Sequence, residues 1–117
     1  LIAAGNLARD GIEARVLDCH TIKPIDREAV MAAARECRGI VTAEDHFTIG
    51  GLGSAVAELV SQDCPMRVRR VGLADGFASS GRDYRKLLAH FRMDATEIER
   101  QAIQAGRNFS RRRFPPE

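Results

Sequence analysis

The sequence lacks the features that mark several large classes of protein. Its three cysteines, Cys19, Cys37 and Cys64, lie far apart and form no Cys-x-x-Cys pair. This spacing argues against a zinc site or a disulfide framework and favours reduced thiols in or near the core, as in cytoplasmic proteins. The apolar runs are far shorter than a membrane span, and no charged-then-apolar leader precedes them. We therefore expect a cytoplasmic protein with no membrane partner.

The chain also lacks a strong charge of one sign over most of its length. Its formal net charge is +2, but the last eleven residues carry +3, from Arg107, Arg111, Arg112 and Arg113 against Glu117, which leaves −1 on residues 1–106. A body with no net basic field does not attract nucleic acid, so we expect no nucleic-acid partner. Residues 107–117 are expected to form an Arg-rich tail that is solvated or packed on a partner.

The length fits one domain with one core. The chain has 117 residues, of which 44% are hydrophobic, an ordinary value for a globular protein. It begins at Leu1, without Met and within an apolar-periodic segment. This start favours a fragment or a carboxyl-terminal domain of a longer protein. We expect one domain over residues 1–106, whose first strand would precede Leu1.

Helical and strand patterns alternate along the chain. The apolar spacing predicts strands over residues 12–19, 40–43 and 66–73, and helices over residues 1–9, 26–37, 52–60, 84–91 and 94–106. Asp26 and Asp94 are expected to be N-caps, with Ile25 and Val30 as a hydrophobic staple and Glu97 completing a capping box. This alternation predicts an α/β fold, a three-layer α/β/α sandwich with a mainly parallel sheet.

Two polar, glycine-containing segments follow the second and third predicted strands. Because parallel strands end at the same edge of a sheet, where ligands and partner domains usually dock, we expect a domain-docking edge there. Phe77 is its expected apolar anchor. We expect no catalytic, cofactor-binding or metal-binding residue in the chain. The residues of the expected edge are Glu44, Asp45, His46, Gly50, Gly51, Gly53, Ser54, Asp75, Phe77, Ser80 and Gly81.

Each of these segments also has a simpler interpretation. The glycines match neither the dinucleotide fingerprint nor the phosphate loop, so a tight strand-to-helix turn is favoured over an anion site. His46 between two carboxylates could shuttle a proton, as in a small hydrolase. However, no serine or cysteine nucleophile can be tied to it. Successive residues of an extended segment also point in alternate directions, so Glu44, Asp45 and His46 cannot all face one point. An inter-domain hydrogen-bonding role is favoured.

Three ordered motifs carry a resemblance to a known family. The runs Asp18–Asp26, Glu44–Glu58 and Gly72–Gly81 resemble the carboxyl-terminal domain of transketolase and its relatives in order and spacing. The likeness extends from Leu1 to about Gly106. Two of these motifs resemble transketolases more than deoxyxylulose-phosphate synthases or the β subunits of 2-oxoacid dehydrogenases. They are Glu-Asp-His before the double glycine, and Asp-x-Phe-x-x-Ser-Gly. Those two families, and a stand-alone protein-interaction module, are the alternatives.

The resemblance implies an accessory role. In this family, thiamine diphosphate and Mg are held by two other domains, and the sequence lacks the Gly-Asp-Gly segment with the metal-binding asparagine. The chain is therefore expected to support the homodimer of an enzyme that moves a two-carbon ketol unit between sugar phosphates. Its expected partners are the thiamine-binding domains, on the same or a separate chain. Alone, it is expected to be inactive and to bind no cofactor.

Overall fold

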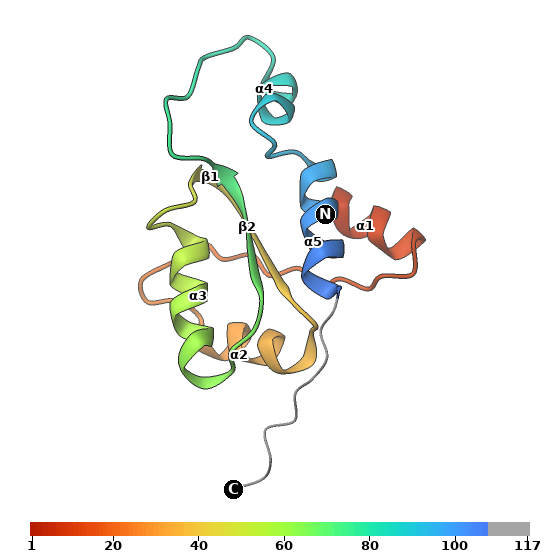
Figure 1. Cartoon of the computed structure of the whole chain (residues 1–117), viewed down its shortest axis with the longest axis vertical. Helices are drawn as coiled ribbons and strands as arrows, with labels where there is room; N and C mark the ends of the chain where they lie inside the picture. The colour runs from red at the N-terminus through yellow and green to blue at the C-terminus, as the bar shows by residue number, and fades with distance from the viewer. Residues whose placement is uncertain (108–117) are drawn as a thin grey trace, which may run out of the picture.

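The computed structural model describes residues 1–107, which fold into five helices and two strands (Figure 1). In chain order these elements are α1 (Ile2–Arg9), α2 (Arg27–Glu36), β1 (Ile40–Phe47), α3 (Leu52–Asp63), β2 (Val68–Leu73), α4 (Tyr84–His90) and α5 (Ala95–Gly106). Within this range no helix has both the length and the apolar character needed to span a membrane. Of the predicted tail, Arg107 alone lies among the described residues.

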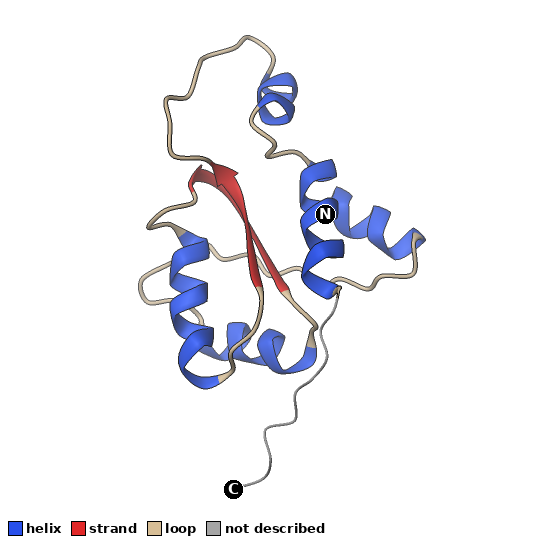
Figure 2. Ribbon diagram, viewed as in Figure 1, coloured by secondary structure: helices blue, strands red, loops and turns tan. Residues whose placement is uncertain are grey.

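The helices cover both faces of a parallel sheet, which confirms the predicted α/β architecture. β1 pairs in parallel with β2, in a register that places Ile40 opposite Val68 and Ala43 opposite Val71. α3 contacts both strands, and so does α5; α2 packs on α3, and α1 packs on α5. Figure 2 shows α3 on one side of the strands, α5 and α1 on the other, and α2 below the strands next to the lower end of α3. The layers are therefore helix, sheet and helix.

The main hydrophobic core lies between α2, α3 and the sheet. It is formed by Val30, Ala34, Val56 and Val60, which are all almost fully buried. Ile25 packs against this cluster, as expected of a residue that staples the start of α2. Asp26 caps the same helix, as predicted, since its carboxylate accepts a hydrogen bond from the Ala29 N–H at 3.0 Å.

One predicted strand is wrong. Residues 12–19 form no strand, and within residues 1–107 the sheet consists of β1 and β2. A strand requires a neighbour that satisfies its backbone N–H and C=O groups, and no described residue pairs with this segment. Its apolar side chains are consequently exposed, with exposed fractions of 53% for Val16 and 41% for Leu17. The nearest pairing is an isolated bridge between Ile22 and Ile25.

Three boundaries differ from the prediction by two residues or more. β1 continues past Ala43 to Phe47, so the charged triplet belongs to the strand. α3 runs to Asp63, and β2 starts at Val68. The two extensions arise because polar residues can continue a strand or helix where its end is exposed. β2 starts at Val68 because that residue lies opposite Ile40, the first residue of β1.

The last helix, α5, forms one of the two hydrogen bonds of the predicted capping box. The Asp94 carboxylate accepts a hydrogen bond from the Glu97 N–H at 3.0 Å. The Glu97 carboxylate bonds instead to the Arg100 guanidinium, at 2.6 and 2.8 Å, and to the Gln101 amide at 2.7 Å. These hydrogen bonds, that from Arg100 foremost, lower the pKa of Glu97 to about 2. The carboxylate is thus held in its charged form inside the first turns of α5.

Candidate functional site

The turn between β1 and α3 is built around the Glu44 side chain. Its carboxylate accepts hydrogen bonds from the backbone N–H groups of Leu52, at 2.7 Å, and Gly53, at 3.2 Å. These groups belong to the first turn of α3, where backbone donors have no partner within the helix and the helix dipole favours a negative charge. The side chain of Glu44 therefore caps α3 from the neighbouring strand.

The glycines of this turn are required by space and by backbone conformation. A Cβ atom at Gly51 would collide with the Glu44 carboxylate. A Cβ atom at Gly53 would lie 2.7 Å from Thr42 Oγ1 and 2.6 Å from the Arg70 side chain. Gly50 has a φ of +75°, a left-handed value that favours glycine. The three glycines thus allow α3 to start directly against the end of the sheet.

Ser54 and Arg70 hold the turn closed. The Ser54 hydroxyl accepts a hydrogen bond from the Gly50 N–H at 3.0 Å and donates one to the Thr48 carbonyl at 3.3 Å. The Arg70 guanidinium donates to the same Thr48 carbonyl at 3.1 Å. Sequence reasoning missed Arg70, although the period of two in β2 places it on the same face as Val68, whose side chain packs toward α3.

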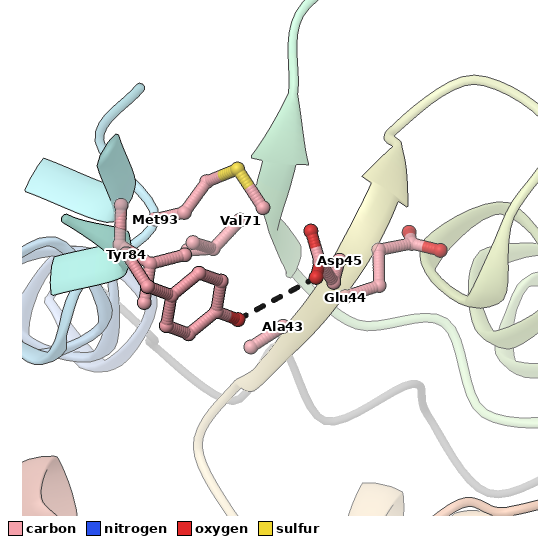
Figure 3. Close-up of a pocket in the computed structure, with 7 residues that line it drawn as sticks. Ala43, Glu44, Asp45, Val71, Tyr84 and Met93 are labelled. Atoms are coloured by element: carbon pink, nitrogen blue, oxygen red, sulfur yellow. Dashed lines mark hydrogen bonds between the residues drawn. The ribbon is translucent and has the colours of Figure 1, made fainter. Parts of the chain in front are cut away.

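Asp45 points to the opposite face of the sheet from Glu44. Its carboxylate accepts a hydrogen bond from the Tyr84 hydroxyl at 3.5 Å, and in Figure 3 the Glu44 side chain extends away from this pair. Asp45 lies at the rim of an open cavity of about 190 Å³, which we call the α4 hollow. Its walls come from the sheet and from the region of α4, and include Ala43, Val71, Tyr84, Leu88 and Met93.

His46 stands apart from both carboxylates. It is exposed, its Nδ1 lies 3.1 Å from the Phe47 carbonyl, and its ring packs edge-on against the Phe47 ring. Because Glu44 is directed toward α3 and Asp45 toward Tyr84, the strand does not assemble the three side chains into a proton-transfer group. Glu44 and Asp45 thus point in different directions, as expected of successive residues in an extended segment.

The second predicted segment lies in the loop between β2 and α4. Asp75, Phe77, Ser80 and Gly81 are all exposed, and the Phe77 side chain is fully accessible. In Figure 1 this loop leaves the same edge of the sheet as the turn between β1 and α3. Within residues 1–107, no hydrogen bond joins the loop residues to that turn. The structure therefore places the two sets at one edge without merging them into one cluster.

The described residues offer little that would hold a metal ion. Between Leu1 and Arg107, no three His, Cys, Asp or Glu side chains come together in an arrangement that could bind one. Cys19, Cys37 and Cys64 are free and partly buried.

Comparison with known proteins identifies relatives over most of the chain. Residues 1–98 match the family model described as "Transketolase, C-terminal domain". The chain is 48% identical over 103 residues to the 6-deoxy-6-sulfo-D-fructose transketolase subunit SqwH of Clostridium sp. (strain MSTE9), covering 87% of this chain and 31% of the relative. It is 40% identical over 102 residues to an apulose-4-phosphate transketolase subunit of Phocaeicola vulgatus, covering 86% of this chain and 32% of the relative.

A second kind of relative and a solved structure agree with this placement. The chain is 43% identical over 83 residues to the 1-deoxy-D-xylulose-5-phosphate synthase 1 of Geobacter sulfurreducens, covering 69% of this chain and 13% of the relative. A solved structure described as a split gene transketolase, an inactive β4 tetramer, matches with a TM-score of 0.82 and 41% identity, covering 90% of this chain and 33% of that chain. The chain spans about a third of the length of the two transketolase subunits. Taken together, these matches show that the chain belongs to the transketolase C-terminal domain family.

Proposed function

We propose that this chain is the accessory carboxyl-terminal domain of a thiamine-diphosphate-dependent transketolase, a cytoplasmic enzyme of carbohydrate metabolism. The whole enzyme would transfer a two-carbon ketol unit between sugar phosphates, and this domain, residues 1–106, would not be catalytic by itself. The observation that carries the proposal is the family match over residues 1–98, combined with 48% identity to a transketolase subunit.

Among residues 1–107 we identify no site that fits thiamine diphosphate and its metal. The Glu44 carboxylate is engaged by the N-terminus of α3, and the α4 hollow presents mostly apolar walls. Across residues 1–107, no group of three acidic, His or Cys side chains could bind the metal. We therefore assign thiamine diphosphate and Mg to other domains and derive no catalytic step for this chain.

The carboxyl edge of the sheet is the proposed docking surface for the thiamine-binding domains in a homodimeric enzyme. The exposed side chains Phe47, Ile49 and Phe77 lie in or beside the two segments at this edge, with exposed fractions of 40%, 65% and 106%. Large apolar side chains exposed at one edge of a domain are typical of surfaces that bind another protein. Gly50, Gly51, Gly53 and Ser54 shape the edge, and the exposed His46, Asp75, Ser80 and Gly81 are accessible to the partner.

Reconstitution tests the proposal. The chain is produced with the thiamine-binding domains encoded beside it, on one polypeptide or two. Transfer of a two-carbon unit from a ketose phosphate to an aldose phosphate is then followed by mass spectrometry with thiamine diphosphate and Mg²⁺. We expect activity in the assembled enzyme, none in the isolated chain, and no calorimetric binding of the cofactor to the isolated chain. An isotherm for the isolated chain would overturn the assignment of the cofactor to other domains.

Replacing Phe77 tests the docking edge. Because Phe77 is fully exposed, Phe77→Ala should leave the melting temperature of the chain unchanged while weakening its association with the thiamine-binding domains by about tenfold. Ile2→Ala is the matched control, since Ile2 is 74% exposed but belongs to α1, away from this edge. An equal effect of both variants would count against docking through the carboxyl edge.

A second function has a specific observation in its favour. The match to a 1-deoxy-D-xylulose-5-phosphate synthase favours the carboxyl-terminal domain of such a synthase. That match covers less of the chain than the transketolase subunits do, so we rank it second. Formation of 1-deoxy-D-xylulose 5-phosphate by the assembled enzyme, without ketol transfer, would reverse the order.

A further inference from the structure

The α4 hollow combines apolar walls with an acidic rim. Val71 from β2 and Leu88 and Met93 from the region of α4 form its apolar walls, and the exposed Ala43 leaves it open at the edge of β1. Its volume of about 190 Å³ far exceeds the roughly 10–15 Å³ that one water molecule requires. The hollow therefore has room for a side chain from another molecule.

The Asp45 carboxylate at the rim has no cationic partner among residues 1–107. The Asp45 carboxylate is exposed and has one hydrogen bond, from the Tyr84 hydroxyl at 3.5 Å, a long distance for an O–H donor. No Lys, Arg or His side chain of residues 1–107 forms an ion pair with it. Figure 3 shows the two oxygen-bearing groups facing each other across the hollow, with the Glu44 carboxylate directed elsewhere.

We propose that the α4 hollow binds a Lys or Arg side chain of the thiamine-binding part of the enzyme, an inference that rests on the proposed function. The aliphatic stem of such a side chain would cover Val71, Leu88 and Met93, while its charged end would donate hydrogen bonds to Asp45 and Tyr84. Long basic side chains bury their stems and keep their charge at a rim in this way, and a bond to a carboxylate is about twice as strong as a neutral one. Charge complementarity selects this occupant, because an acidic or purely apolar side chain would leave Asp45 unpaired.

The charge of Asp45 is tested with a variant that keeps its shape. Asp45→Asn removes the charge, and Asp10→Asn is the matched control, because Asp10 is an exposed acid at the end of α1 that neither lines the hollow nor belongs to the docking edge. Association of each variant with the thiamine-binding domains is measured by calorimetry at two salt concentrations. We expect the dissociation constant to rise about tenfold for Asp45→Asn, with a weaker salt dependence, and less than twofold for Asp10→Asn.

A second variant tests the hollow itself. Ala43→Leu would fill the open side of the hollow, and it should weaken the same association while circular dichroism shows that the chain remains folded. Wild-type components that associate and transfer the ketol unit, combined with an unchanged dissociation constant for Asp45→Asn, would overturn this inference and leave the proposed function intact. Wild-type components that do not associate would overturn both.

Discussion

The backbone of Gly51 passes so close to the Glu44 carboxylate that any side chain at position 51 would collide with it. The carboxylate cannot retreat without losing its hydrogen bonds to the Leu52 and Gly53 N–H groups. Gly51 and the Glu44 cap of α3 therefore form one structural unit, in which the cap requires glycine at position 51. This unit fixes where α3 begins relative to the end of β1, and with it the geometry of the proposed docking edge.

Gly51→Ala should destabilise the chain by about 1–3 kcal/mol, the range expected when an extra methyl group is forced into a packed site. Urea unfolding followed by circular dichroism measures the change. Gly76→Ala is the matched control in a loop, because a Cβ at Gly76 meets nothing within 4 Å, and it should be neutral or slightly stabilising. Equal stability of the two variants would show that the Glu44 carboxylate can move away from a Cβ at position 51 without loss of unfolding free energy.

Glu44→Gln should cost about 1 kcal/mol, since it keeps the side-chain shape but removes the negative charge at the N-terminus of α3. Glu13→Gln, in the exposed segment after α1, should change the unfolding free energy by less than about 0.5 kcal/mol. Combined with Gly51→Ala, the Glu44→Gln change should show a non-additive effect, because the two positions share one contact. Strict additivity in the double variant would argue that the positions are independent.

Ser54→Ala should open the turn between β1 and α3. The Gly50 N–H would lose its acceptor and the Thr48 carbonyl one of its donors, at an expected cost of about 0.5–1.5 kcal/mol. Hydrogen exchange measured by NMR should show faster exchange of the Gly50 amide. Ser79→Ala, in the exposed loop after β2, should leave that amide unchanged. Unaltered exchange at Gly50 in Ser54→Ala would contradict the assigned hydrogen bond.

Glu97 should make the stability of the chain dependent on pH in the acid range. Its pKa is lowered from 4.5 to about 2 in the folded chain, chiefly by its hydrogen bonds with Arg100. A lowered folded-state pKa contributes stability that is present above about 4.5 and lost as the pH falls toward 2. Glu97→Gln should therefore be less stable by about 1 kcal/mol at pH 7, with the difference from wild type closing toward pH 2.

Urea unfolding at a series of pH values measures this dependence. Glu58→Gln, an exposed acid on α3, is the control and should follow the wild-type profile. A constant difference between Glu97→Gln and wild type from pH 7 to pH 2 would show that the carboxylate titrates at its ordinary pKa.

Local signals in the sequence predicted most of the helical architecture. The Asp26 and Asp94 caps could be read from single residues followed by apolar periodicity, and both caps are present. Such signals are reliable because they depend on contacts within a few residues of one another. The predicted strand over residues 12–19 failed for the opposite reason, since alternation shows which residues can form a strand but does not supply the neighbour that the strand needs.

The sequence predicted where the candidate site lies in the fold, but not which side chains contact one another there. The order of strands and glycines indicated the carboxyl edge of the sheet, whereas the pairing of Glu44 with the start of α3 and of Asp45 with Tyr84 depends on side-chain directions in three dimensions. Arg70 was missed because a basic residue on a strand is usually solvated, and its role appears when the Thr48 carbonyl lies beside it. Whether the edge docks a partner stays a prediction.

Because successive side chains of β1 point to opposite faces of the sheet, one residue of the strand stabilises the fold and the next faces the proposed partner. Glu44 faces α3 and fastens the fold, while Asp45, one position later, faces the open hollow and solvent. If the hollow binds a basic side chain as proposed, changes at position 45 would alter which partner the domain accepts without loosening its interior. Changes at position 44 would instead cost stability, because they remove the cap of α3. The relatives of this chain include transketolase subunits named for different sugars. In such a family, single substitutions at position 45 would let the same fold associate with a different partner subunit.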